Sequence, residues 1–258
     1  MLSSRIIVPA GAGRRFHPRL WPTLVAATGC LLLIMLGTWQ LERLQWKEQL
    51  IAERAARLAA PPATLPADGA DWAAWDFREV RAAGSFRHDL ELLFGARAIG
   101  GRFGHHVLTP LVRPDGPAVL VDRGWVPADK AHPAARRAGQ SEGAVEVGGI
   151  ARYRADDTPN WFTPDNQPAE RLWFGYDLPA MEEALGLELL PVVIEADATP
   201  NPGGLPQAGQ TRTELPNRHL QYVITWYGLA LALLAIYVAF SLERAPCPMS
   251  ARERDPLR

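Results

Sequence analysis

Two long uncharged runs lie near the ends of this 258-residue chain, and the stretch between them is charged and polar. Residues 20–41 and residues 220–242 contain no Asp, Glu, Lys or Arg. An α-helix rises ~1.5 Å per residue, so a run of 22 residues such as the first spans roughly 33 Å, against a hydrocarbon core of ~30 Å. The pattern therefore predicts two transmembrane helices, residues 20–41 and 219–242.

A cleavable signal peptide is the alternative for the first run, with Arg14, Arg15 and Arg19 as its basic segment. However, the run is long for the apolar part of a signal peptide, and no clean Ala-x-Ala site follows it directly. Apolar residues instead continue at helical spacing between charges, at Leu41, Leu44, Leu50, Ile51 and Leu58. This continuation favours an uncleaved anchor. A buried helix of a soluble domain is the alternative for the second run, but the length of that run argues against it.

Basic residues on either side of the two runs give only a weak indication of orientation. Four precede the first run and four follow it, which leaves that helix undecided: Arg5, Arg14, Arg15, Arg19, then Arg43, Lys47, Arg54, Arg57. The second run favours a cytoplasmic C-terminus, because two basic residues precede it and four follow: Arg212, Arg218, then Arg244, Arg252, Arg254, Arg258. Two spans put both termini on one side, so the central domain is expected outside.

The central region reads as a mainly antiparallel β domain with little helix. A linker is expected at 61–70, a short helix at 178–186 ending at Gly186, and a Pro/Gly-rich return at 198–216. Short β-like runs bounded by Gly and Pro predict strands near 78–86, 90–97, 105–113, 117–122, 144–153, 171–176 and 190–197.

The predicted fold class is thus an α+β membrane protein, with two transmembrane helices flanking a mainly antiparallel β extramembrane domain. The predicted divisions are a cytoplasmic N-terminus at 1–19, spans at 20–41 and 219–242, an extracytoplasmic domain at 42–218, and a cytoplasmic tail at 243–258.

Composition excludes several kinds of function. The formal net charge is −1, so bulk electrostatics do not indicate a nucleic-acid partner. The only cysteines are Cys30 and Cys247, both outside the central domain, which therefore has neither a disulfide nor a thiolate metal site.

No catalytic motif stands out, and the chain is not expected to be an enzyme. Gly100, Gly101 and Gly104 lack the spacing of a dinucleotide fingerprint, and there is no P-loop or Gly-x-Ser-x-Gly. The residue types that could form a metal site are present at His88, His105, His106, His132, Asp89 and Asp122. Because adjacent residues of a strand point to opposite faces, surface or turn roles are favoured for these histidines.

The segment Asp122-Arg-Gly-Trp-Val-Pro127 follows an apolar run and joins a charge pair to a glycine and a tryptophan. It is interpreted as a structural motif at the end of a strand rather than as a catalytic one. Gly124 permits an unusual backbone conformation there, and Trp125 packs on the core. Arg123 and Pro127 complete the motif.

His219 is the most informative histidine, because it lies at the predicted start of the second span. Asn217 is a plausible N-cap, and the helix dipole disfavours an imidazolium in the first turn. Tyr222 and Trp226 share the face of His219, at i+3 and i+7. Axial ligation of a haem iron is chemically reasonable for such a histidine. Spacing alone favours the alternative, an interfacial histidine bonded to phosphate, water or a backbone carbonyl.

Four stretches in order along the chain resemble the Surfeit locus protein 1 family, membrane proteins that assist the biogenesis of haem–copper cytochrome oxidases. They are Leu36-Gly-Thr-Trp-Gln-Leu-Glu-Arg-Leu-Gln-Trp-Lys47, Thr109-Pro110 with the segment 122–127, Trp161-Phe-Thr-Pro-Asp-Asn166 with Trp173, and Asn217-Arg-His-Leu-Gln-Tyr-Val-Ile-Thr-Trp-Tyr-Gly-Leu-Ala230. The family more often has Asn where this chain has Asp122 and Arg218.

The resemblance implies that the chain is an assembly factor that binds haem a and helps to insert it into subunit I of cytochrome c oxidase. In this chain it implies His219 as the iron ligand, with Trp39, Tyr222 and Trp226 beside the haem. The implied partners are subunit I, the haem a synthesis machinery and the lipid bilayer, with no nucleic acid. Together with the short N-terminus, it implies a bacterial inner membrane with the central domain in the periplasm.

Two alternatives remain open at this point. The first is a chaperone for an oxidase subunit that never touches haem, in which the aromatic loops and Trp39 and Trp226 contact protein. The second is a membrane-anchored periplasmic enzyme, which the absence of a catalytic motif argues against.

Overall fold

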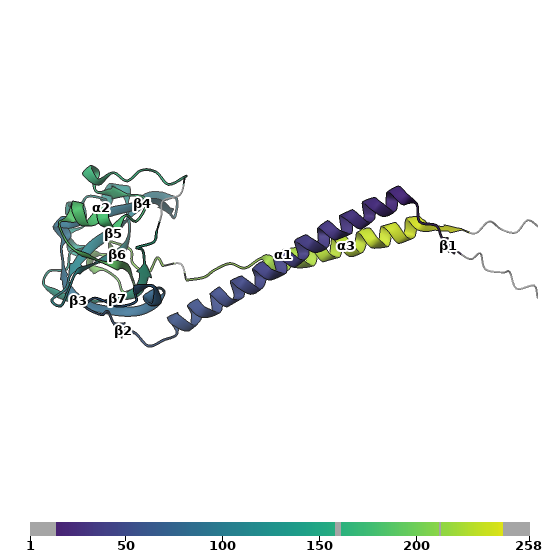
Figure 1. The fold of residues 1–258 in the computed structure, drawn as a ribbon. Coiled ribbons are helices and arrows are strands. Elements are labelled where there is room, and N and C mark those ends of the chain that lie inside the picture. The colour runs from purple at the N-terminus through teal and green to yellow at the C-terminus, as the bar shows by residue number, and fades with distance from the viewer. Residues whose placement is uncertain (1–13, 158–160, 212, 245–258) are drawn as a thin grey trace, which may run out of the picture. The chain divides into compact units, whose positions relative to one another are not determined.

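The computed structural model describes residues 14–157, 161–211 and 213–244. It divides into two compact units, one formed by the two long helices and the other by the β domain. The first unit comprises residues 1–50 and 216–258, and the second comprises residues 51–215. Figure 1 shows the elements of both.

The first unit is a pair of long apolar helices. Helix α1 covers Leu20–Leu58, of which the part up to Leu50 lies in this unit, and α3 covers His219–Ser241. Both are long and apolar enough to cross a bilayer, by length and composition. Two short strands, β1 (Arg14–Phe16) and β10 (Leu242–Arg244), pair antiparallel at the end where α1 begins and α3 stops.

The less exposed positions of both helices recur every three or four residues, which is the spacing of a coiled-coil seam. On α1 the series with this spacing is Thr23, Ala26, Cys30, Leu33, Gly37, Gln40 and Leu44. On α3 it is His219, Val223, Trp226, Ala230, Leu233, Tyr237 and Ser241. The helices therefore meet along one stripe each, and most of the residues between those positions are exposed.

Glycines on α1 allow the two helices to approach closely. A Cβ at Gly37 would lie 2.9 Å from the Tyr227 ring, and one at Gly29 would lie 2.8 Å from Leu233. By contrast, a Cβ at Gly228 would meet nothing within 4 Å. Small residues at such contacts bring helix backbones together, as in membrane helix pairs.

Hydroxyl groups also connect the two helices, at the seam and beside it. Thr23 Oγ1 and Tyr237 Oη lie 2.7 Å apart, and Thr38 Oγ1 and Tyr227 Oη lie 3.1 Å apart. In an apolar environment a polar group without a partner is costly, so these pairs specify the register of the two helices.

The second unit is built around a closed, five-stranded β-barrel. Its strands follow one another around the barrel in the order β3, β7, β9, β6 and β5, and β5 pairs back to β3 through Ser85–Val112 and Phe86–Leu111. The barrel strands are β3 (Arg78–Phe86), β5 (Arg102–Val112), β6 (Ala118–Pro127), β7 (Ala144–Tyr153) and β9 (Leu189–Ala196). Strands β2 (Ala63–Thr64), β4 (Leu92–Ile99) and β8 (Leu172–Trp173) add to its edges.

Most of these pairings are antiparallel, which confirms the predicted character of the domain. The antiparallel pairs are β3–β5, β3–β7, β4–β5, β5–β6 and β7–β9. The parallel pairs are β2–β3, β4–β8 and β6–β9.

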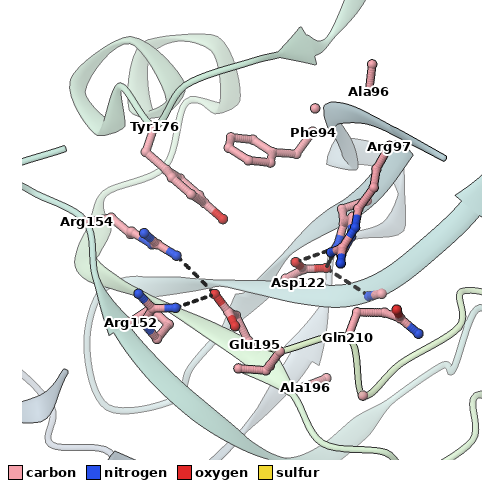
Figure 2. Close-up of a pocket in the computed structure, with 15 residues that line it drawn as sticks. Phe94, Ala96, Arg97, Asp122, Arg152, Arg154, Tyr176, Glu195, Ala196 and Gln210 are labelled. Carbon is pink, nitrogen blue, oxygen red and sulfur yellow. Dashed lines mark hydrogen bonds and ion pairs between the residues drawn. The ribbon is translucent and has the colours of Figure 1, made fainter. Parts of the chain in front are cut away.

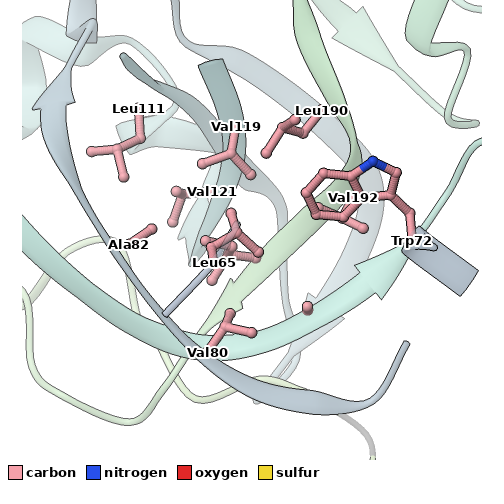
Figure 3. Close-up of a cluster of buried hydrophobic side chains, with 11 residues drawn as sticks. Leu65, Trp72, Val80, Ala82, Leu111, Val119, Val121, Leu190 and Val192 are labelled. Atoms are coloured by element: carbon pink, nitrogen blue, oxygen red, sulfur yellow. The ribbon is translucent and has the colours of Figure 1, made fainter. Parts of the chain in front are cut away.

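Alternation along the strands sorts side chains between two apolar clusters. Val119 and Val121 of β6 point into the barrel, where they pack in the cluster drawn in Figure 3. Leu120, between them, points outward into a second cluster, which α2 (Leu178–Leu185) covers through Met181. This helix ends at Gly186, as predicted; the structure adds that Asp177 caps its start and that Gly186 has the left-handed conformation.

Several predicted boundaries need correction. The helix that contains the expected span at 20–41 is not one of them, since it continues to Leu58, as the amphipathic pattern after the span predicted. The expected linker at 61–70 contains β2, and Leu65 is buried in the barrel, so this segment is part of the fold. The strand expected at 117–122 runs on to Pro127, and the one expected at 171–176 shrinks to two residues.

The closing β3–β5 contact leaves no room for a side chain at Gly84. A Cβ there would lie 2.5 Å from the Val112 carbonyl oxygen. Gly84→Ala is expected to lower the free energy of unfolding by about 1–3 kcal/mol through overpacking, measured by urea unfolding of the detergent-solubilised protein. Ser85→Thr adds a methyl at the exposed next position and is expected to change stability little. Equal effects of the two substitutions would contradict this account of closure.

Candidate functional site

His219 is the first residue of α3, and its side chain is fixed by a residue of α1. Its Nδ1 lies 2.7 Å from Oε1 of Gln40. Both residues occupy seam positions, so helix packing brings together side chains that are 179 residues apart. Arg218 is the cap residue of the helix, not Asn217 as predicted, but the Asn217 side chain still accepts a hydrogen bond from the His219 N–H at 3.2 Å.

The contact with Gln40 selects one tautomer of the imidazole. An amide oxygen can only accept, so Nδ1 carries the proton and donates it to Gln40. In the neutral ring, Nε2 then holds the lone pair, and no described residue hydrogen-bonds to that nitrogen. A hydrogen bond from the second nitrogen is how proteins orient a metal-binding histidine.

The aromatic residues predicted near His219 lie on the same two helices. Trp39 and Tyr222 are about half exposed, at 52% and 50%. Trp226 lies on the seam, and its indole Nε1 is buried without a hydrogen-bond partner in the described structure. Sequence reasoning identified these aromatic residues but missed Gln40, which has no distinguishing local signal.

The donor set is compatible with a haem iron held by one protein nitrogen. An imidazole whose Nε2 has no partner among the described residues is suited to an axial ligand. Among the described residues, no group of three or more His, Cys, Asp or Glu side chains is arranged to hold a bare metal ion.

The predicted structural motif lies in the β domain, where Arg123 is almost wholly buried. Its guanidinium donates to the Gly139 carbonyl and to Asn201 Oδ1, and it stacks 4.7 Å from the centre of the Phe86 ring. The nearest carboxylate is that of Glu91, at 3.8 Å. Arg123 therefore ties strand β6 to two loops.

Glu91 is the anion at the centre of this buried network. Arg136 Nη2 lies 2.7 Å from its Oε2, and His88 Nδ1 lies 3.1 Å from its Oε1. Burial acts to raise the pKa of Glu91, but hydrogen bonds from His88 and Arg136 and their positive charges outweigh it, so the pKa is lowered. Burial also lowers the pKa of Arg123 to about 10, with Glu91 opposing that shift, so Arg123 remains charged at neutral pH.

Gly124 and Trp125 position the segment that follows the last barrel strand. Gly124 has φ +111°, and a Cβ on it would collide with the Gln207 carbonyl. Trp125 exchanges backbone hydrogen bonds with Gln207, and its indole Nε1 donates to the Arg97 carbonyl at 3.0 Å. Pro127 ends β6. The expected packing of Trp125 is observed, since the residue is 3% exposed.

A cavity of about 500 Å³ opens on the outer face of the barrel, beside this motif (Figure 2). Its floor carries Glu195, to which Arg152 and Arg154 form ion pairs at 3.1 and 3.0 Å. On its other side, His106 Nδ1 lies 2.8 Å from Asp122 Oδ2.

His88 lies in a short 3-10 turn, as expected, and its side chain, 14% exposed, pairs with Glu91 three residues later. His106 differs from its predicted surface or turn role, because its side chain is only 12% exposed and pairs with Asp122 on the neighbouring strand. Strand pairing brings these two residues together, which is why the local pattern did not indicate this contact. His105, on the opposite strand face from His106, contacts the Gly95 carbonyl instead.

The fold and the site define a class of protein in which a closed β-barrel domain is inserted between two apolar helices, the second beginning at an oriented histidine. The model of the SURF1 family matches residues 27–231, and the chain belongs to that family. This confirms the resemblance inferred from the four stretches.

Named relatives agree with this assignment. The SURF1-like protein of Monosiga brevicollis is 42% identical over 216 residues, covering 79% of this chain and 81% of that protein. Surfeit locus protein 1 of Rattus norvegicus is 38% identical over 226 residues, covering 82% and 72%. The Homo sapiens protein of that name is 38% identical over 227 residues, covering 82% and 74%.

The buried network predicts a large, pH-dependent effect of Glu91→Gln. Removing the anion leaves two buried guanidinium groups without their carboxylate. The free energy of unfolding is therefore expected to fall by about 3–5 kcal/mol in denaturant titrations at pH 7. The folded-state pKa of Glu91 is lowered, so its contribution is complete above the unfolded value of 4.5 and is lost as the pH falls through the folded value.

The difference between wild type and Glu91→Gln should therefore shrink in acid. Glu146→Gln is the matched control, because Glu146 pairs with Arg81 on the exposed surface, where a pair contributes about 0–1 kcal/mol. A difference that is independent of pH would show that the Glu91 carboxylate is not the stabilising group.

Proposed function

We propose that this protein is an assembly factor for haem–copper cytochrome c oxidase that binds haem a transiently and helps to insert it into subunit I. Membership of the SURF1 family supports a role in cytochrome c oxidase assembly. The haem-binding part of the proposal goes further and rests on the chemistry of His219.

The observation that carries the proposal is the hydrogen bond between His219 and Gln40. It presents Nε2 of a neutral imidazole as a free lone pair, which is what a ferric or ferrous haem requires of a protein ligand. Haem a would bring a large apolar surface, and Trp39, Tyr222 and the apolar faces of both helices offer matching contacts. When bound, the haem would supply the iron centre, while the protein holds and orients it.

We propose a bacterial inner membrane as the location, with the β domain in the periplasm; the two apolar helices support the membrane part of this proposal. Both helices meet the length and composition of membrane spans. His219 would then lie near the periplasmic interface, where a lipid-soluble haem could pass from its synthesis machinery to subunit I.

A second candidate function is a chaperone for an oxidase subunit that does not bind haem. Its support comes from aromatic side chains that the β domain leaves open to solvent. Phe103, Trp161 and Phe162 are 74%, 93% and 89% exposed. Exposed aromatic residues of this size are typical of protein-contact surfaces.

His219→Ala is expected to abolish the absorbance of bound haem a in protein purified from cells that make haem a, because no other described group presents a free imidazole Nε2 at the start of α3. His17→Ala is the matched control, since His17 is an exposed histidine that precedes α1. It should retain the wild-type spectrum. Wild-type haem absorbance in His219→Ala, or normal oxidase haem content in a deletion strain, would overturn the haem proposal.

Oxidase maturation in the same His219→Ala strain separates the two candidate functions. If haem delivery is the activity, active oxidase should fall together with the haem signal. Normal maturation despite a lost haem signal would instead favour the chaperone.

Gln40→Ala should weaken haem a binding roughly 10–100-fold without abolishing it, because the ligand remains but its orienting partner is gone. Gln40→Glu keeps an oxygen acceptor for Nδ1–H and should bind nearly as well as wild type. Gln221→Ala, at an exposed position of α3, is the control. The affinities are measured by titrating haem a into the detergent-solubilised apoprotein; similar affinities for Gln40→Ala and Gln221→Ala would remove Gln40 from the site.

A further inference from the structure

The cavity on the outer face of the barrel combines paired carboxylates with donor groups that are not paired to a carboxylate. Both of its carboxylates are already paired. Glu195 accepts from Arg152 and Arg154, and Asp122 accepts from His106 and from the Gly124 N–H.

The positive charges of Arg152 and Arg154 are also balanced, by ion pairs with carboxylates. Besides Glu195, Arg152 pairs with Asp76 at 3.1 Å, and Arg154 pairs with Asp157 at 3.1 Å. Each of these guanidinium groups therefore contacts two carboxylates. Neither one by itself gives the cavity a preference for anions.

Arg97 is different, because none of its described contacts is with a carboxylate. Its side chain reaches only His106, with Nη1 and Nε2 3.4 Å apart. His106 donates from Nδ1 to Asp122, so Nε2 accepts from Arg97. This series of hydrogen bonds, Asp122–His106–Arg97, holds the Arg97 guanidinium at the cavity (Figure 2). Its other N–H groups have no acceptor among the described residues.

Tyr176 adds a second free donor. Its hydroxyl has no hydrogen-bond partner in the described part of the chain and points toward the centre of the cavity (Figure 2). Burial, reinforced by the charge of Asp122, raises the pKa of this phenol, so it keeps its proton and can donate. Its ring stacks on Phe94 with centroids 4.2 Å apart, which makes one wall of the cavity aromatic.

We propose that this cavity binds an oxyanion, a carboxylate or phosphate carried on a flat apolar body, with Arg97 and Tyr176 donating to the oxyanion and the Phe94–Tyr176 pair contacting the body. A volume of about 500 Å³ suits a small molecule. The arrangement matches a few convergent polar groups set beside apolar surface, which is the usual form of such sites.

The motif 122–127 acquires a second role in this site. Asp122 anchors the chain that aims Arg97, and Gly124 admits the backbone at Gln207, whose continuation through Gln210 lines the cavity. Trp125 fixes the backbone of Arg97 through its indole hydrogen bond. The oxyanion site lies wholly within the β domain and does not depend on haem binding at His219.

The test is isothermal titration calorimetry of benzoate and of phenyl phosphate with the full-length protein in detergent. Wild type should bind at least one of them, and the tighter probe identifies the preferred oxyanion. Arg97→Gln should weaken that probe about tenfold or more, the scale of a charged hydrogen bond. Tyr176→Phe, which removes only the hydroxyl, should weaken it several-fold.

Arg81→Gln is the matched control, because Arg81 is an exposed strand arginine of the same domain outside the cavity. It should bind like wild type, and near-UV circular dichroism checks that all variants are folded. Failure of wild type to bind either probe, or equal binding by Arg97→Gln and Arg81→Gln, would overturn the proposal. The absence of probe binding would not alter the haem spectra expected for wild type and His219→Ala, so the two proposals are tested separately.

Discussion

The pairing of β3 with β5 is the constraint on which the β domain depends. By closing the sheet, it gives every barrel strand one face toward an enclosed apolar core and one face outward. The outward faces then have different surroundings on different sides of the barrel. Part of this surface is covered by α2, and beside it the same strands present Asp122, His106 and Glu195 to a cavity. Without closure, the apolar residues of these strands would have no enclosed core, and the polar residues would not be held on a separate outer face.

Buried charge in this domain is tolerated because opposite charges and polar groups lie next to it. Glu91 contacts two guanidinium groups and an imidazole, and Arg123 in turn satisfies loop carbonyls as well as that carboxylate. An isolated charge at this depth would be strongly unfavourable, so the loops that carry Gly139 and Asn201 are held by the network. The most recognisable motif of the chain thus joins the barrel to its loops, and on its other face shapes the cavity.

In the helical unit, too, a few specific contacts determine how the elements pack. Apolar helices gain little from hydrophobic burial against each other in lipid, so glycines and hydroxyl pairs determine how they meet. That register places Gln40 opposite His219. The His219 imidazole is held in one orientation because the partner helix supplies an acceptor for one of its nitrogens.

The sequence by itself determined the features that arise from neighbouring residues. Two uncharged runs, a helix capped by Asp177 and ended by Gly186, and most strand centres are local patterns, and four ordered stretches identified the family. Only the tertiary structure decided which distant groups meet. Leu65 belongs to the barrel core although it lies in an expected linker, His106 pairs with Asp122, and Gln40 pairs with His219. These pairings depend on strand register and helix packing, which no local pattern of residue types encodes.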